Sequence, residues 1–191
     1  MRNTLAQHFP QGASGGHDLH APLTAADHRR GALRPKVIVV EYADFTSRAC
    51  RAAEPAVRLL LAANPETVQL VFRHFPIEFA HPLALMAAQA SEAAAAQGKF
   101  WEMHDALLHG DASLSRAALD RAAQALKLNM SLFKLSLDDE IYRHRIREHE
   151  DGGFKSHLHA SPEFFVNDTV CDVSFGLEHL ESTVRAALGR D

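Results

Sequence analysis

The chain has 191 residues, of which 47% are hydrophobic and 23% are charged, and its formal net charge is −4. This length suits one domain with a sizeable core, and the composition is typical of a soluble globular protein. Because acidic and basic residues are interspersed without a long basic tract, the sequence argues against a nucleic-acid partner.

The first 35 residues show hardly any apolar periodicity. We expect residues 1–35 to form an N-terminal arm that is mobile or wraps over the domain that follows. The opening MRNTLAQHFPQG lacks the apolar stretch of a secretory signal peptide, and no apolar run of the chain reaches the roughly 18 residues of a membrane span. We therefore expect a cytoplasmic protein without a membrane partner.

From Lys36 onward the pattern becomes regular. The run KVIVVEY (36–42) is apolar at nearly every position, which is typical of a buried central strand. Residues 52–63 have helical spacing, Asn64-Pro65-Glu66 breaks that helix, and TVQLVFRHF (67–75) predicts a second strand. Strand, helix and strand in this order indicate a βαβ unit with parallel strands.

The next 75 or so residues have a helical pattern throughout. Glycines are placed to end several of these helices, and Ser115 and Asn129 are placed as N-caps. The expected helices cover 83–97, 99–109, a segment after Ser115, a segment from Met130, and a last one that ends before Gly152-Gly153.

The β pattern then returns. FFVN (164–167), an Asn167-Asp168 turn and TVCDV (169–173) predict a hairpin, and an amphipathic helix follows with an apolar face of Leu177, Leu180, Val184 and Leu188. The order βαβ, helices, ββα predicts an α/β or α+β fold with a small mixed sheet.

A half-motif stands between the first strand and the first helix. Ser47-Arg48-Ala49-Cys50 occupies the place where a Cys-X-X-Cys dithiol would announce redox chemistry. Only the second cysteine is present. Thiol–disulfide exchange needs a thiolate that attacks and a second thiol that resolves the mixed disulfide.

Four further segments of the chain are distinctive: VIVVEYADF, LVFRHFPIEFAHPLA, EAAAAQGKFWEMHDALL and SPEFFVND. By these segments the chain resembles the DsbA-like branch of the thioredoxin superfamily over about residues 26–188. This resemblance implies a thioredoxin-like α/β fold in residues 36–191, with a DsbA-type helical insertion at about 81–151.

The same resemblance implies the site residues. Where the family usually has Phe-Glu-Cys-Pro-Tyr-Cys, this chain reads Phe-Thr-Ser-Arg-Ala-Cys, so Ser47 takes the place of the attacking cysteine and Cys50 that of the resolving one. The family's cis-proline loop corresponds to Ala160-Ser161-Pro162-Glu163. This match makes Pro162 the expected cis-proline and assigns substrate binding to Ser161, Pro162 and Glu163.

Ser47 has two interpretations. A serine hydroxyl is a far weaker acid than a thiol, and a helix dipole alone would not ionise it near neutral pH. Ser47 is therefore expected to cap the helix by accepting from the backbone N–H of Ala49 or Cys50. The alternative is that it donates to a bound thiolate, as the serine of the kappa-class glutathione transferases does for glutathione in a similar fold.

The two cysteines also leave alternatives. Cys50 lies one turn into the helix and is either buried and inert or, because Arg48 and Arg51 flank it, a monothiol favoured as thiolate. Cys171 falls in the predicted hairpin, away from the motif, and is expected in the core or at a sheet edge.

The 13 histidines do not predict a metal site. His104 and His109 are five residues apart, as are His144 and His149, so neither pair shares a helix face. Three functions remain: an oxidoreductase-family protein altered at its nucleophile, a glutathione-dependent or monothiol enzyme, and a non-catalytic module. The partner would be a peptide, a protein thiol or glutathione at the cis-proline loop, and no other cofactor is expected.

Overall fold

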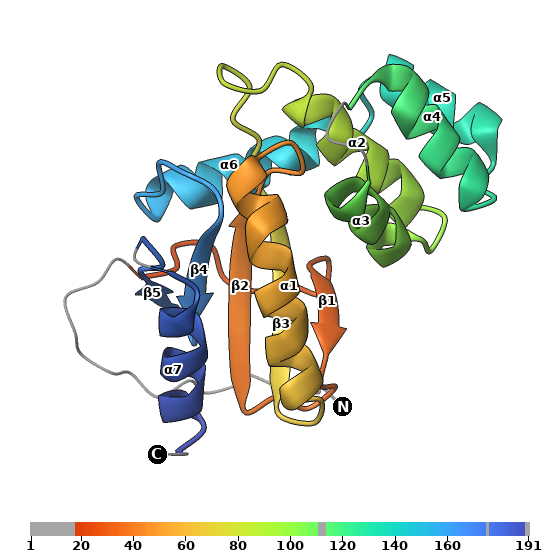
Figure 1. The fold of residues 1–191 in the computed structure, drawn as a ribbon. Helices are drawn as coiled ribbons and strands as arrows, with labels where there is room; N and C mark the ends of the chain where they lie inside the picture. The colour runs from red at the N-terminus through yellow and green to blue at the C-terminus, as the bar shows by residue number, and fades with distance from the viewer. Residues whose placement is uncertain (1–17, 111–113, 175, 190–191) are drawn as a thin grey trace, which may run out of the picture.

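A five-stranded mixed sheet of order β1-β3-β2-β4-β5 forms the centre of the protein (Figure 1). The structure is a computed structural model and describes residues 18–110, 114–174 and 176–189. The strands are β1 (His28–Gly31), β2 (Val37–Ala43), β3 (Val68–His74), β4 (Glu163–Val166) and β5 (Thr169–Cys171). This is the thioredoxin-like α/β architecture that the sequence predicts.

The two central strands are the parallel pair expected from the βαβ pattern. Val37 of β2 lies opposite Val68 of β3, and every residue of both strands is buried. Side chains alternate between the two faces of a strand. Val37 and Val39 therefore pack on one side of the sheet, and Ile38 and Val40 on the other.

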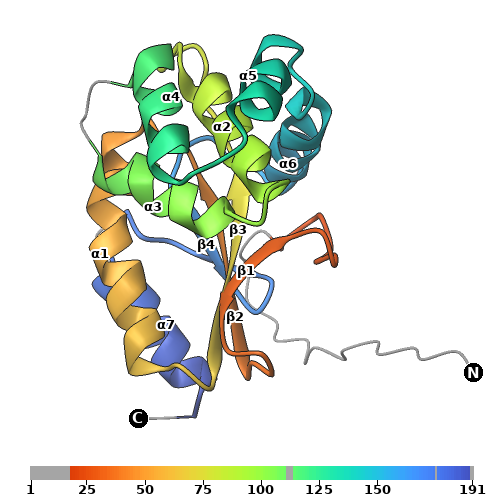
Figure 2. The ribbon, with the colours of Figure 1, turned by 90° about the vertical axis from the view of Figure 1, so that its right-hand side faces the viewer.

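Helices α1 (Arg48–Ala63) and α7 (Glu178–Ala187) lie side by side on one face of the sheet (Figures 1 and 2). They bury Val57 and Leu60 from α1, and Leu180 and Val184 from α7, against the valines of β2 and β3. These are the apolar positions that give each helix its amphipathic spacing.

The N-terminal segment supplies an edge strand that the sequence did not predict. Residues 1–17 of the expected arm lie outside the described residues. Residues 28–31 pair antiparallel with β3, His28 opposite Phe72, and Leu19 and Leu23 cover the sheet face away from α1. With the sequence HRRG, β1 lacks the apolar alternation of a strand, as charged edge strands often do.

The helical insertion covers the end of the sheet where β2 and β3 finish (Figure 2). Its core combines insertion residues such as Met103 and Phe133 with Phe45 and Cys50 from the motif region. Ser115 and Asn129 cap α4 and α5 through their side chains, as expected. The helices are α2 (Ala84–Ala95), α3 (Phe100–His109), α4 (Arg116–Ala125), α5 (Met130–Asp138) and α6 (Arg143–Lys155).

The prediction that the last insertion helix ends before Gly152-Gly153 is wrong. Both glycines lie inside α6, where the helix packs tightly on the sheet. A Cβ at Gly153 would stand 2.7 Å from the Phe75 ring, and one at Gly152 would stand 2.9 Å from the Ala21 side chain. The glycines are therefore required for close packing and do not end the helix.

The C-terminal hairpin is confirmed. Strands β4 and β5 pair antiparallel around Asn167 and Asp168, which have φ values of 48° and 70°. Two consecutive residues with positive φ are typical of a two-residue hairpin turn. Within the described residues, no helix has the length and apolar character needed to cross a membrane.

Candidate functional site

The half-motif forms the first turn of α1. Ser47 is the N-cap, and its hydroxyl accepts from the backbone N–H of Cys50 at 3.4 Å. Asp44, just after β2, connects the turn before α1 to the segment after β3. Its carboxylate accepts from the backbone N–H of Thr46 at 2.7 Å and of Ile77 at 3.1 Å, and lies 2.8 Å from His81 Nδ1. Ser47 thus caps the helix as expected. Asp44, which holds the segment before α1 in place, was not predicted from the sequence.

The proline loop lies against the motif. The peptide bond between Ser161 and Pro162 is cis, and the Ser47 hydroxyl donates to the backbone carbonyl of Ser161 at 3.3 Å, across 114 residues of sequence. Glu163 begins β4 and is half-buried, and its pKa is raised by burial and by Asp172. All the residues predicted for the site thus lie in the motif or in the facing loop.

Cys50 is enclosed by protein. Its side chain is 1% exposed, and its sulfur accepts from the backbone N–H of Asp44 at 3.4 Å. Burial raises the pKa of the Cys50 thiol to about 12, and the hydrogen bonds from Asp44 and Ser47 offset this only in part. Arg48 is exposed, and Arg51 donates to the Gly110 carbonyl at 2.9 Å. The flanking arginines therefore do not make Cys50 a thiolate.

Cys171 lies in a different part of the core. It is buried at the end of β5, among the residues that α7 covers, and its sulfur is 3.6 Å from the Thr183 hydroxyl. Burial raises its pKa as well. Both cysteines are free thiols. Cys171 was expected in the core or at a sheet edge, and it is buried on the edge strand β5.

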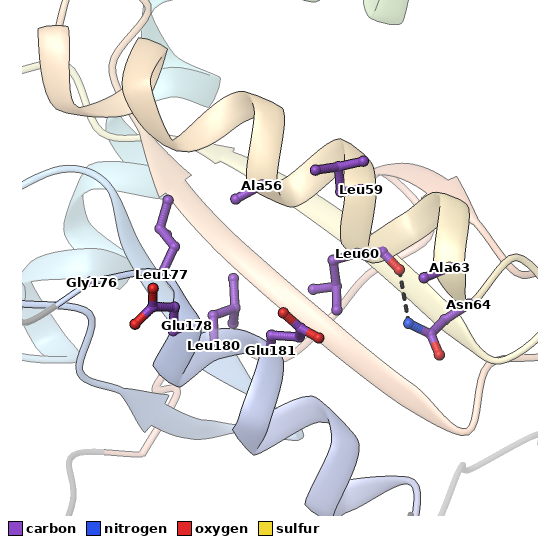
Figure 3. A pocket seen from close by; sticks show the side chains of 10 residues that line it. All are labelled: Ala56, Leu59, Leu60, Ala63, Asn64, Gly176, Leu177, Glu178, Leu180 and Glu181. Atoms are coloured by element: carbon purple, nitrogen blue, oxygen red, sulfur yellow. Dashed lines mark hydrogen bonds between the residues drawn. The ribbon is translucent and has the colours of Figure 1, made fainter.

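A groove opens between α1 and the proline loop. It has a volume of about 360 Å³, and all its lining residues except Glu163 are small or apolar: Ala49, Ala52, Ala53, Ala160, Ser161, Pro162, Glu163, Val173, Ser174 and Leu177. A larger hollow of about 560 Å³ follows it between α1 and α7, where Leu59 is 71% exposed (Figure 3). Leu177 borders both. We place the site at the smaller groove because it contains the loop that faces the motif.

A buried carboxyl group lies beneath α1. Glu41 follows Val37 and Val39 at two-residue intervals along β2, so its side chain is on the same face of the sheet, the one that α1 covers. Burial, reinforced by Glu54, raises the pKa of Glu41 to about 8. Its Oε2 has no hydrogen-bond partner among the described residues. The sequence signal for this group was a single acid within an otherwise apolar strand.

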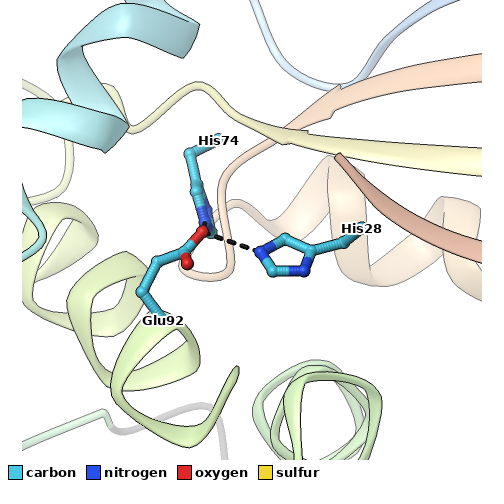
Figure 4. Close-up of side chains that lie close together, drawn as sticks. All are labelled: His28, His74 and Glu92. Atoms are coloured by element: carbon cyan, nitrogen blue, oxygen red, sulfur yellow. Dashed lines mark hydrogen bonds and ion pairs between the residues drawn. The ribbon is translucent and has the colours of Figure 1, made fainter. Parts of the chain in front are cut away.

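Two clusters of metal-ligand residue types also form in space. In the first, the Nε2 atoms of His28 and His74 each lie 2.8 Å from Oε1 of Glu92 (Figure 4). Nε of Arg145 donates to the same oxygen at 2.9 Å. Because a guanidinium already neutralises this carboxylate, we interpret the cluster as a buried charge network.

The second cluster joins Glu54, His104 and Asp105. The Arg30 guanidinium holds both oxygens of Asp105 at 2.9 Å, so a cation is again supplied by the protein. Sequence spacing could not reveal either cluster, because each draws its members from different elements. The absence of a metal site stays a prediction.

Comparisons with known proteins agree with this geometry. A family model described as thioredoxin matches residues 23–186. A thioredoxin-like oxidoreductase from Silicibacter pomeroyi superposes with a TM-score of 0.77 at 25% identity, covering 88% of this chain and 95% of that one. BdbD from Bacillus subtilis gives a TM-score of 0.77 at 20% identity, with coverage of 91% and 98%, and supports the fold alone.

Curated relatives carry a different name. A Na⁺/H⁺ antiporter NhaA 3 from Salinispora tropica is 43% identical over 178 residues, which are 92% of this chain and 27% of the antiporter. An antiporter NhaA 1 from Salinispora arenicola is 42% identical over 171 residues, covering 89% of this chain and 26% of that protein. The chain thus spans about a quarter of the length of these relatives. By its family match and its sheet topology, the chain belongs to the thioredoxin superfamily, and its fold is DsbA-like.

Proposed function

We propose that the protein is a DsbA-like module that binds an extended peptide or protein segment in the groove between α1 and the proline loop, without dithiol exchange. The chemistry of exchange requires two thiols that meet at one site. In this chain Ser47 replaces the nucleophilic cysteine, and Cys171 belongs to a separate part of the core.

The observation that carries the proposal is the state of Cys50. A thiol that is 1% exposed, with a pKa raised to about 12, is protonated at neutral pH and shielded from a second reactant. The groove beside it is lined by exposed alanines and by the proline loop, which suit an extended peptide. The binding surface is therefore kept while the reactive sulfur is hidden.

Glutathione chemistry receives less support. A thiolate held by Ser47 would need the hydroxyl hydrogen, which the structure directs to the Ser161 carbonyl. A monothiol reaction would need an accessible Cys50. Both remain outcomes of the experiment below.

The redox test compares the wild-type chain with Ser47→Cys in insulin-reduction and disulfide-oxidation assays. We expect the wild type to show background rates only, and Ser47→Cys to gain measurable exchange because the new thiol would lie at the N-terminus of α1. Wild-type rates comparable to those of a dithiol oxidoreductase would overturn the proposal. A rise in melting temperature with millimolar glutathione would favour the glutathione alternative instead.

The binding test uses an immobilised library of unstructured peptides. Ala52→Trp should fill the groove and abolish capture of peptides that the wild type retains, because Ala52 is exposed and lines it. Ala117→Trp, at an exposed position of α4, is the matched control and should bind normally. If the two variants behave alike, the groove is not the binding site.

The antiporter relatives suggest which partners to test first. In those proteins a segment like this chain makes up about a quarter of a longer polypeptide named for sodium–proton exchange. We therefore propose segments of ion transporters as the first partners to include in the library.

A further inference from the structure

A further pocket includes His159, the residue just before the proline loop. It has a volume of about 210 Å³ and is formed by the segment after β3 and by the C-terminal half of α6. Its lining residues are Phe75, Ile77, Glu78, Phe79, Glu150 and Phe154, with Pro76 and His159 at its border. A volume of this size suits one side chain of a partner.

The pocket presents aromatic rings to solvent. Phe79 is 93% exposed, and Phe154 is also exposed, with its ring edge-to-face against Phe75 at 5.1 Å. An exposed phenylalanine on its own needs no explanation, but two around one hollow mark a contact site.

The same pocket carries negative charge. Glu150 is partly buried on α6, and Glu78 lies beside it on the segment after β3. Burial, followed by repulsion from Glu78, raises the pKa of Glu150 to about 7, and Asp151 adds to this effect. Arg147 and Arg143 oppose it only in part. Ionised Glu150 therefore lacks full compensation and would be stabilised by an added cation.

Consecutive residues line this pocket and the groove. His159 borders the pocket, and its neighbours Ala160 and Ser161 line the groove. Since an extended chain advances roughly 3.3 Å per residue, we expect a peptide that crosses the loop from the groove to reach the pocket within a few residues.

We propose that this pocket takes the guanidinium group of an arginine side chain from the bound peptide, stacked on Phe79 and Phe154 and paired with Glu150. The assignment rests on the function proposed above and defines its substrate class as peptides with an arginine next to an apolar residue. A planar guanidinium is the side-chain cation best suited to stack on a ring and to pair with a carboxylate at once.

The test measures binding of five-residue peptides in which arginine occupies each position in turn, with citrulline twins that keep the shape and lose the charge. At pH 8 one arginine peptide should bind roughly tenfold more tightly than its citrulline twin, in line with a partly desolvated cation–π contact and ion pair. The preference for arginine should shrink at pH 6, where Glu150 is protonated. The other charged or titratable groups near Glu150 are Glu78, Asp151, Arg143, Arg147 and His159.

Glu150→Gln and Phe79→Ala should each remove the arginine preference. Glu148→Gln, at an exposed site on the same helix, should keep it. Equal affinities for arginine and citrulline peptides in the wild type, or a preference that survives Glu150→Gln, would overturn the assignment.

A second probe separates this inference from the proposed function. N-acetyl-arginine methylamide should shift the NMR signals of Phe79 and Phe154 in the wild type and leave them unchanged in Glu150→Gln. If that probe binds while no peptide engages the groove, the proposed function fails and the guanidinium site stands. If peptides bind the groove but the probe moves neither ring, the site fails and the function stands.

Discussion

At the scale of single residues, two features define the motif region: Ser47 has an oxygen where the family has a cysteine sulfur, and the buried acid Glu41 lies beneath the motif. The oxygen of Ser47 caps α1 and meets the proline loop, while the sulfur of Cys50 lies behind it in the core. Glu41 lies on the same side of the sheet and raises the pKa of Cys50 further, after the larger effect of burial. The interior under the motif thus disfavours negative charge on either group.

Glu41→Gln should stabilise the protein in a pH-dependent way. The folded-state pKa of Glu41 is raised to about 8, so the folded protein holds a proton that the unfolded chain, with a pKa near 4.5, releases. The stability that goes with this proton is complete below about pH 4.5 and is lost as the pH rises through about 8. Glutamine mimics the protonated form at every pH, so the gain over wild type should rise to about 4 kcal/mol at pH 8.

Urea denaturation at pH 5 and pH 8 measures this gain. Glu66→Gln, at an exposed position between α1 and β3, is the control and should change the free energy of unfolding by less than about 0.5 kcal/mol. A gain that is the same at both pH values would contradict the raised pKa of Glu41.

At the scale of elements, α6 depends on a residue with low helix propensity. Replacing glycine by alanine within a helix usually adds about 1 kcal/mol of stability. At Gly153 the added Cβ would meet two Phe75 ring atoms at 2.7 and 2.8 Å, and that ring is buried against Tyr42. Because that ring also packs edge-to-face against both Tyr42 and Phe154, overpacking should prevail, and Gly153→Ala should lower stability by about 1–3 kcal/mol.

A double-mutant cycle checks the cause. Phe75→Leu removes the ring that the new methyl group would strike, so Gly153→Ala should cost less in that background, and the difference is the coupling energy. If Gly153→Ala proves stabilising in the wild type, helix propensity outweighs the contact and the packing argument is wrong.

The same elements show what the sequence could predict. Strands β2 and β3 were predictable because burial on both faces leaves a continuous apolar run, and Ser115 and Asn129 because capping is local chemistry. Strand β1 was not predictable, since its sequence HRRG has no apolar alternation and the strand is defined by its backbone pairing with β3. The glycines of α6 resemble a helix end in sequence, and only the nearness of Phe75 explains them.

In the candidate site, too, local motifs were predictable from the sequence and contacts between distant segments were not. Ser47, Cys50 and the proline loop were predictable from the resemblance, because each lies in a contiguous motif. The burial of Cys50 was left open, since it depends on the helical insertion packing around it. The pocket at Phe79 and Glu150 combines residues about 70 positions apart, and no local pattern announces it.

At the scale of the whole molecule, buried charge networks tie the N-terminal segment to both halves of the fold. Arg73 of β3 donates to Asp27 at 3.0 Å and to the backbone carbonyl of Ala21 at 2.8 Å. Glu92 of α2 gathers His28 from β1, His74 from β3 and Arg145 from α6. The second network therefore joins the sheet to the insertion that shields Cys50.

Glu92→Gln should loosen this junction without changing its shape. Burial alone would raise the pKa of Glu92, but the hydrogen bonds from His28 and His74 and the charges of these two rings outweigh it and hold that pKa well below its usual range. The Glu92 carboxylate, to which Arg145 also donates, therefore stabilises the folded state. The amide keeps an acceptor oxygen but leaves the Arg145 cation uncompensated, and we expect a loss of about 2–4 kcal/mol at pH 7.

Chemical denaturation measures this loss, and amide hydrogen exchange locates it. Exchange should quicken in β1 and α6, which the network joins, more than in α7 on the far side of the sheet.

Because the folded-state pKa of Glu92 is lowered, the stability that its carboxylate contributes is present above about pH 4.5 and declines as the pH falls further. The difference in unfolding free energy between variant and wild type should therefore be constant above pH 5 and shrink below pH 4. Glu102→Gln, which loses only the exposed pair with Lys99, should change stability by less than about 1 kcal/mol. Unaltered exchange in β1 would show that pairing with β3 alone holds the N-terminal segment, because the loss of the carboxylate would then leave that strand as firmly bound as before.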